Sequence, residues 1–103
     1  MFARVTTLEG PPEHVDDFRH ALVEHMLPAL RRLEGYQGVL ILTDREGGKV
    51  LGVSLWESEE SMGASEEAAY WFRAYGAEAA SERVTSVERY EVVFSEVVKG
   101  TRP

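Results

Sequence analysis

The sequence predicts an α+β fold in which one four-stranded antiparallel sheet carries both of its helices on the same face. Three observations lead to this prediction. Apolar residues alternate with a period of two in four segments and recur at spacings of three and four in two others. The segments follow one another as strand, helix, strand, strand, helix, strand, which is the split βαβ order. Two strands, 36–43 and 49–56, are apolar on both faces.

The first two elements are a strand and a one-sided helix. Residues 2–9 alternate, and the Gly-Pro-Pro break at 10–12 favours a helix that begins at the second proline and runs to Glu34. Pro28 lies inside this helix, where it removes a backbone hydrogen bond, so we expect a kink or break near Leu27. The apolar residues on one side of the helix are Val15, Phe18, Leu22, Met26, Ala29 and Leu33.

The remaining elements are a hairpin, a second helix and a last strand. The hairpin turn 44–48 contains two glycines, which can adopt positive φ. Ser58 is a good N-cap, and Gly63 and Ser65 suggest a short helical piece before the main helix. The predicted ranges are helix 66–81 and strand 85–98. We therefore expect one domain over residues 1–98 and a loose tail at 99–103.

The two-sided apolar strands predict a partner. A half-solvated antiparallel strand is apolar on one face only, and two helices can cover just one face of the sheet. A second copy of the chain is the simplest cover for the other face, because a two-fold axis places the same patch against itself. The sequence thus predicts a homodimer through sheet faces. The alternating side chains are Leu40 and Leu42 against Val39 and Ile41, and Leu51, Val53 and Leu55 against Val50 and Trp56.

Composition excludes several classes of partner and site. Acidic residues outnumber basic ones by 18 to 11, giving a net charge of -7, so nucleic acid and anionic membrane surfaces are poor partners. Cysteine is absent, which excludes disulfides and thiolate metal sites. The apolar run 39–42 is too short to span a bilayer, and the chain starts with a strand-like segment, so we expect a cytoplasmic protein.

Three stretches resemble the antibiotic biosynthesis monooxygenase (ABM) family. They are Leu33-Glu34-Gly35-Tyr36-Gln37-Gly38, then Leu55-Trp56-Glu57-Ser58-Glu59-Glu60-Ser61-Met62, and finally Arg89-Tyr90-Glu91-Val92. The resemblance implies a ferredoxin-like protomer, a homodimer whose sheets form a dimeric α+β barrel, and a pocket between sheet and helices for a flat organic molecule. Family members include cofactor-free oxygenases acting on polycyclic phenols or quinols, haem-degrading enzymes, and proteins of no known activity.

The chain departs from the functional residues of the best-known members. Haem-degrading members use an Asn in the first strand and a Trp and a His in the second helix. This chain has no Asn, and the other two positions fall near Ser65 and Tyr75. Polyketide-tailoring oxygenases use an Asn, a Trp and a Tyr, and here Trp71 and Tyr75 stand at shifted positions. Haem degradation is therefore disfavoured, and the first hypothesis is a monooxygenase without bound cofactor that acts on a quinol or phenol.

This hypothesis gives roles to six residues. His25 and Tyr75 are the predicted catalytic residues, because a histidine near neutral pKa can deprotonate a phenol. The predicted substrate-binding residues are Phe18, Trp71, Phe72 and Tyr90. The same aromatic residues could equally be ordinary core and interface side chains. No metal site is expected, because His20 and His25 are five residues apart and do not share a helix face.

A rival function stays open. The chain could be a non-catalytic dimer that binds a small hydrophobic ligand, or could have an accessory or stress-response role. The two functions make different demands on the pocket. An enzyme needs a group that accepts a proton within reach of a solvent-connected cavity, whereas a binding protein needs only an apolar slot.

Overall fold

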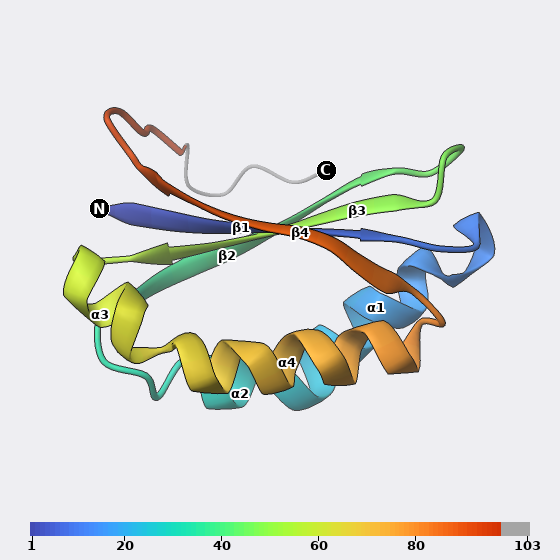
Figure 1. The fold of residues 1–103 in the computed structure, drawn as a ribbon, viewed down its shortest axis with the longest axis horizontal. Coiled ribbons are helices and arrows are strands. Elements are labelled where there is room, and N and C mark those ends of the chain that lie inside the picture. The colour runs from blue at the N-terminus through green and yellow to red at the C-terminus, as the bar shows by residue number, and fades with distance from the viewer. Residues whose placement is uncertain (98–103) are drawn as a thin grey trace.

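A four-stranded antiparallel sheet forms one layer, and the helices form a second layer on one of its faces (Figure 1). The computed structural model describes residues 1–97. The strands are β1 (Phe2–Glu9), β2 (Tyr36–Asp44), β3 (Lys49–Trp56) and β4 (Arg83–Glu91), in the spatial order β2-β3-β1-β4. This arrangement confirms the predicted α+β, ferredoxin-like fold. Within residues 1–97, no helix combines the length and the hydrophobicity needed to cross a bilayer.

The first predicted helix is divided at the place where Pro28 was expected to disturb it. Its parts are the 3₁₀ turn η1 (Pro12–His14), α1 (Val15–Ala21), the π-helical turn η2 (Leu22–Met26) and α2 (Leu27–Leu30). In the π-turn the Leu27 N–H donates to the Leu22 carbonyl, one residue further back than in an α-helix. Pro28 then occupies the first turn of α2, where its missing N–H is tolerated. The helix ends at Leu30, four residues earlier than predicted.

The second helical region also has two parts, as predicted. They are α3 (Glu59–Ala64) and α4 (Glu66–Ala79). Ser58 caps α3, because its hydroxyl accepts from the Ser61 N–H at 3.0 Å and the Ser61 hydroxyl accepts in return from the Ser58 N–H.

The last strand is shorter than predicted. It ends at Glu91, which pairs with Phe2 at the start of β1, so within residues 1–97 β4 has no partner strand beyond this point. A single backbone bond continues the contact, from the Val92 N–H to the Met1 carbonyl. Residues 92–97 are irregular and expose Val93, Phe94 and Val97, while Val98 and the predicted tail 99–103 lie outside the described residues.

The two faces of the sheet have different neighbours. Between the sheet and the helices lies the core, in which Leu8, Val50 and Trp56 are almost completely buried. The opposite face, which we call the open face, carries no helix in Figure 1. Strand pairing places a continuous apolar set on it: Val5, Leu40, Leu42, Leu51, Val53, Leu55 and Tyr90.

Candidate functional site

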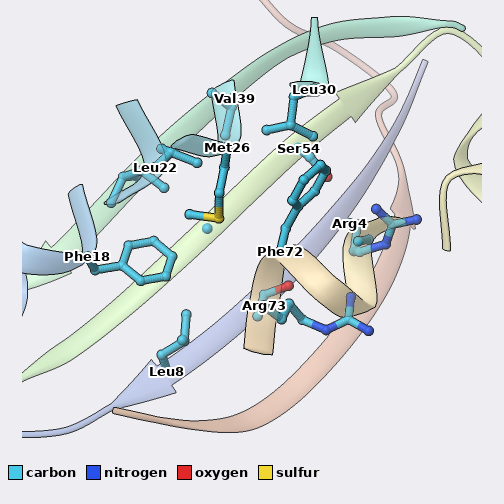
Figure 2. Close-up of a pocket in the computed structure, with 14 residues that line it drawn as sticks. Arg4, Leu8, Phe18, Leu22, Met26, Leu30, Val39, Ser54, Phe72 and Arg73 are labelled. Atoms are coloured by element: carbon cyan, nitrogen blue, oxygen red, sulfur yellow. The ribbon is translucent and has the colours of Figure 1, made fainter. Parts of the chain in front are cut away.

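A cavity of about 70 Å³ lies between the sheet and the helices (Figure 2). Its wall is mostly apolar and comes from both layers, with Leu8, Phe18, Leu22, Met26, Leu30 and Phe72 among the lining side chains. Gly52 of β3 lines the sheet side between its cross-strand partners Thr6 and Ile41. A Cβ at Gly52 would meet only the Ile41 side chain, at 3.7 Å, so the missing side chain leaves room here.

Two arginines close one end of this cavity. Figure 2 shows the guanidinium groups of Arg4 (β1) and Arg73 (α4) beyond Phe72, on the side away from Phe18. Arg4 is 3% exposed, and its guanidinium carbon lies 5.6 Å from the centre of the Trp56 ring. Its Nη2 donates to three oxygens: Met62 O at 2.7 Å, Ser65 Oγ at 2.9 Å and Glu66 Oε1 at 3.0 Å.

Positive charge exceeds negative charge at this end. Glu66 is the shared carboxylate, and it also accepts from Arg89 of β4 through Nε at 2.7 Å and Nη2 at 2.8 Å. Within residues 1–97, Arg4 Nε and Arg73 Nη1 are buried without a hydrogen-bond partner. Burial, reinforced by the nearby charge of Arg4, lowers the pKa of Arg73. Buried donors are nearly always paired in folded proteins, so these two atoms mark a place where an acceptor is missing.

The Glu66 carboxylate should make the fold sensitive to acid. The bonds from Arg89, and then those from Arg4, lower its pKa from 4.5 to about 2. A depressed carboxyl pKa stabilises the fold above the unfolded value, and this stabilisation is lost as the pH falls towards 2. The full shift corresponds to roughly 3 kcal/mol, but the side chain is partly exposed, so we expect a loss of about 1–2 kcal/mol.

Urea unfolding at pH 5.5 and pH 2.5 measures this loss, and Glu66→Gln is the matched variant. The variant should be less stable than the native protein at pH 5.5. Its free energy of unfolding should also change less between pH 5.5 and pH 2.5 than that of the native protein, by about 1–2 kcal/mol. An unchanged difference in Glu66→Gln would assign the acid sensitivity to other carboxylates.

A shallow groove on the outer side of the helices holds three of the predicted site residues. His25, Trp71 and Tyr75 line it together with Met26 and Phe72. His25 is exposed, and its ring meets that of Tyr75 edge-on, with the centroids 5.6 Å apart. Since Met26 and Phe72 also line the cavity, these two side chains form a partition between the groove and the cavity.

The other predicted residues fall in two places. Phe18 and Phe72 line the cavity, as expected of substrate-binding residues, although their role stays a prediction. Tyr90 is half exposed on the open face, opposite Ala3, and therefore lies on the far side of the sheet from the cavity. The structure thus brings five of the six residues to the cavity and the groove and separates Tyr90 from them.

Sequence reasoning missed the three residues that give the cavity its character: Arg4, Arg73 and Gly52. A signal was present for each. Arg4 follows the inward alternation of Phe2, Thr6 and Leu8, which places a charge on the buried face of a strand. Arg73 stands seven residues after Glu66 and so shares its helix face. Gly52 interrupts an otherwise bulky strand, which often marks a close approach of a ligand.

Residues 1–77 match the family described as antibiotic biosynthesis monooxygenase, or ABM. The chain belongs to the ABM family. Among curated proteins, this ABM chain is 39% identical over 67 residues to the uncharacterized protein Rv2558 of Mycobacterium tuberculosis. The match covers 65% of this chain and 28% of the relative, so the relative is much longer than the shared region.

Three solved structures share the ABM fold at low sequence identity. One is a monooxygenase from the gene ActVA-Orf6 of Streptomyces coelicolor, in complex with nanaomycin D (TM-score 0.71, 15% identity, 95% of this chain and 92% of that one). Another is the heme-degrader MhuD of M. tuberculosis, with two hemes bound in its active site. Its TM-score is 0.67 and its sequence identity 20%, and the match covers 94% of this chain and 100% of that one. The third is a dimeric ferredoxin-like protein from an uncultured marine organism. Its TM-score is 0.66 and its sequence identity 14%, and the match covers 94% of this chain and 98% of that one.

Proposed function

We propose that this ABM protein is a monooxygenase without bound cofactor that oxidises a phenol or quinol held between the sheet and the helices. The observation that carries the proposal is an apolar cavity closed at one end by two guanidinium groups, because such a site accepts an aromatic ring with an oxygen at one end. The related fold that holds nanaomycin D, an organic ligand, supports it.

The residues do not favour haem as the ligand. Haem iron is commonly held by a histidine, and none of the three histidines lines the cavity. His14 Nδ1 lies 3.2 Å from the Ala80 carbonyl, His20 is exposed, and His25 lies in the outer groove. The fold shared with MhuD therefore does not extend to a haem ligand at this position.

The proposed reaction needs no reductant other than the substrate. A phenol reacts with one O₂, one oxygen atom enters the ring para to the hydroxyl group, and the other leaves as water. The phenol becomes a quinone and supplies all four electrons. Ionisation of the hydroxyl group starts the reaction, because the phenolate transfers electrons to O₂ far more readily than the neutral phenol. The protein's part is to bind the ring, exclude water and favour ionisation.

A ring requires more space than the cavity offers. A cavity of about 150 Å³ holds benzene in other proteins, and this one measures about 70 Å³. Rotation of Met26 and Phe72 would join the cavity to the groove. A ring with its oxygen towards the arginines would then extend towards His25 and Tyr75. The hydroxyl proton would leave to solvent as the phenolate binds the arginines. His25, at the groove end, is the proposed acceptor of the proton that the para carbon loses as the quinone forms, or of the second hydroxyl proton of a quinol, and Tyr75 is its neighbour there.

Oxygen consumption with a panel of phenols and quinols tests the activity, and Gly52→Val tests the site. A Cβ at this position meets only an ordinary contact, and the two further methyl groups of valine would occupy the cavity, so we expect the fold to keep about its native stability while the cavity is filled. We expect oxygen consumption to fall at least about tenfold. Thr43→Val adds a valine at an exposed position outside the cavity. It removes only the exposed hydrogen bond from the Thr43 hydroxyl group to the Lys49 carbonyl group, so it should keep the native rate of oxygen consumption. Equal rates in Gly52→Val and the native protein would place the reaction elsewhere.

The same assay separates the enzyme from the binding protein. His25→Ala and Tyr75→Phe should each slow oxygen consumption if the groove supplies the proton acceptor. The rival function, non-catalytic binding of a small hydrophobic ligand, is favoured by one observation: no histidine, aspartate or glutamate among the described residues lines the cavity. Phenol binding that Gly52→Val abolishes, without oxygen consumption in the native protein, would favour this rival.

We also propose that the protein works as a homodimer that packs open face against open face. The continuous apolar set on this face supports a partner, since Leu42 is 50% and Leu40 47% exposed in the single chain. The exposed residues Val93, Phe94 and Val97 add apolar surface next to β4. A ferredoxin-like structure with the same fold is dimeric, which supports the same assembly here.

A further inference from the structure

Among residues 1–97, the cluster at the arginine end of the cavity has one carboxylate for three guanidinium groups. Glu66 Oε1 accepts from Arg4 and Arg89, and Oε2 accepts from Arg89. The carboxylate is therefore already shared by two arginines, and Arg73 has no ion pair within residues 1–97. The remaining titratable neighbour of Arg73 is the Tyr70 hydroxyl group. This local excess of positive charge contrasts with the net charge of -7 of the whole chain.

Arg4 and Arg73 differ in what holds them. Arg4 is held by three hydrogen bonds from Nη2, which join β1 to the α3–α4 junction. Its Nε is buried and has no hydrogen-bond partner within residues 1–97. Arg73 has a buried Nη1 without a partner, and its charge lies beside two others of the same sign. Such an arrangement destabilises the empty protein, because a desolvated donor and an uncompensated charge both raise its free energy. Among residues 1–97 the negative charge of Glu66 offsets part of this cost, but that carboxylate is already paired with Arg4 and Arg89.

We propose that Arg73, assisted by Arg4 Nε, binds the ionised oxygen of the ligand, so that this site takes a phenol as its phenolate. The inference rests on the proposed function and names the ionisation state of its substrate. A phenolate oxygen supplies the acceptor that both nitrogens lack and the negative charge that the cluster lacks. In the apolar cavity this attraction is stronger than in water. An opposite charge within hydrogen-bonding range lowers a pKa by about 1–3 units, so the bound phenol should ionise more readily than the free one.

Absorbance of 4-nitrophenol tests the inference, because only its ionised form is yellow, and 4-nitroanisole is the matched ligand that cannot ionise. The protein variants are Arg73→Gln and, as a control for net charge, Arg32→Gln, which removes an exposed arginine from the end of the first helical region. For native protein we expect the bound 4-nitrophenol to ionise at least about one pH unit below the free compound, which corresponds to about tenfold tighter binding of the phenolate.

In Arg73→Gln this preference should fall below about threefold, whereas Arg32→Gln should keep it. The variant should bind 4-nitroanisole as tightly as the native protein, which shows that the cavity is intact. A full preference in Arg73→Gln, or a bound 4-nitrophenol that ionises as in water, would overturn the inference.

The assay also separates this inference from the proposed function. If the protein consumes oxygen with phenols but binds 4-nitrophenol and 4-nitroanisole equally tightly, only the inference is refuted. If the protein prefers the phenolate but consumes no oxygen with any phenol or quinol, only the proposed monooxygenase activity is refuted. Failure of both compounds to bind would overturn the cavity as a site for an aromatic ring, and both proposals with it.

Discussion

A lysine in place of Val53 is expected to turn the proposed dimer into a monomer. Val53 lies on β3, where it pairs with Val5 on one side and Leu40 on the other, so it occupies the middle of the open face. In a face-to-face dimer with two-fold symmetry the change introduces two ammonium groups into one apolar interface. Burying an unpaired charge costs several kcal/mol, so Val53→Lys should weaken the dimer at least about a thousandfold.

Sedimentation at micromolar concentration measures the effect, with circular dichroism to show that the variant is folded. Val53 is half buried in the single chain, so a lysine can extend its ammonium group into water once the partner has left. Ala74→Lys is the matched control, because it adds the same charge on α4, away from the open face. A native protein that sediments as a monomer, or a dimeric Val53→Lys variant, would refute assembly through the open face.

The fold could be predicted from periodicity because each element carries its own signal. Pro28 predicted the break in the first helical region, and Ser58 predicted the start of the second. The end of β4 had no such signal. Apolar alternation continues to Val97, but β1 begins at Phe2 and offers no further partner, so the strand stops at Glu91. Strand length here depends on a neighbour that is more than eighty residues away in the sequence.

The candidate site could be predicted only in part. Phe18 lies before the π-turn and has the position that a regular helix gives it. The wider π-turn rotates its residues relative to α-helical spacing, so His25 lies in the outer groove and not beside Phe18. The place of Arg4 and Arg73 at the cavity was not predicted, because arginine is usually a surface residue. Alternation within β1 places Arg4 on the buried face, but the position of Arg73 and Glu66 beside it depends on how α4 packs near β1, which periodicity within one segment does not reveal.

The second large effect is expected for Arg4→Met. Methionine keeps the apolar length of the side chain but removes the donor that joins the α3–α4 junction to β1 through Met62, Ser65 and Glu66. The carboxylate loses its buried partner, and removing one member of a buried pair typically costs about 3–5 kcal/mol. Because Arg89 still contacts Glu66, we expect about 3 kcal/mol, measured by urea unfolding near neutral pH.

Arg89→Met is the matched comparison, because it removes the same charge from the same carboxylate at a more exposed position. Arg89 is 46% exposed and Arg4 3%. The exposed pair should contribute at most about 1 kcal/mol, since solvent screens it and the side chain loses entropy on pairing. Equal losses in the two variants would mean that burial does not set the strength of these contacts. A stable Arg4→Met variant would instead mean that the hydrogen bonds from Arg4 to Met62, Ser65 and Glu66 do not stabilise the fold.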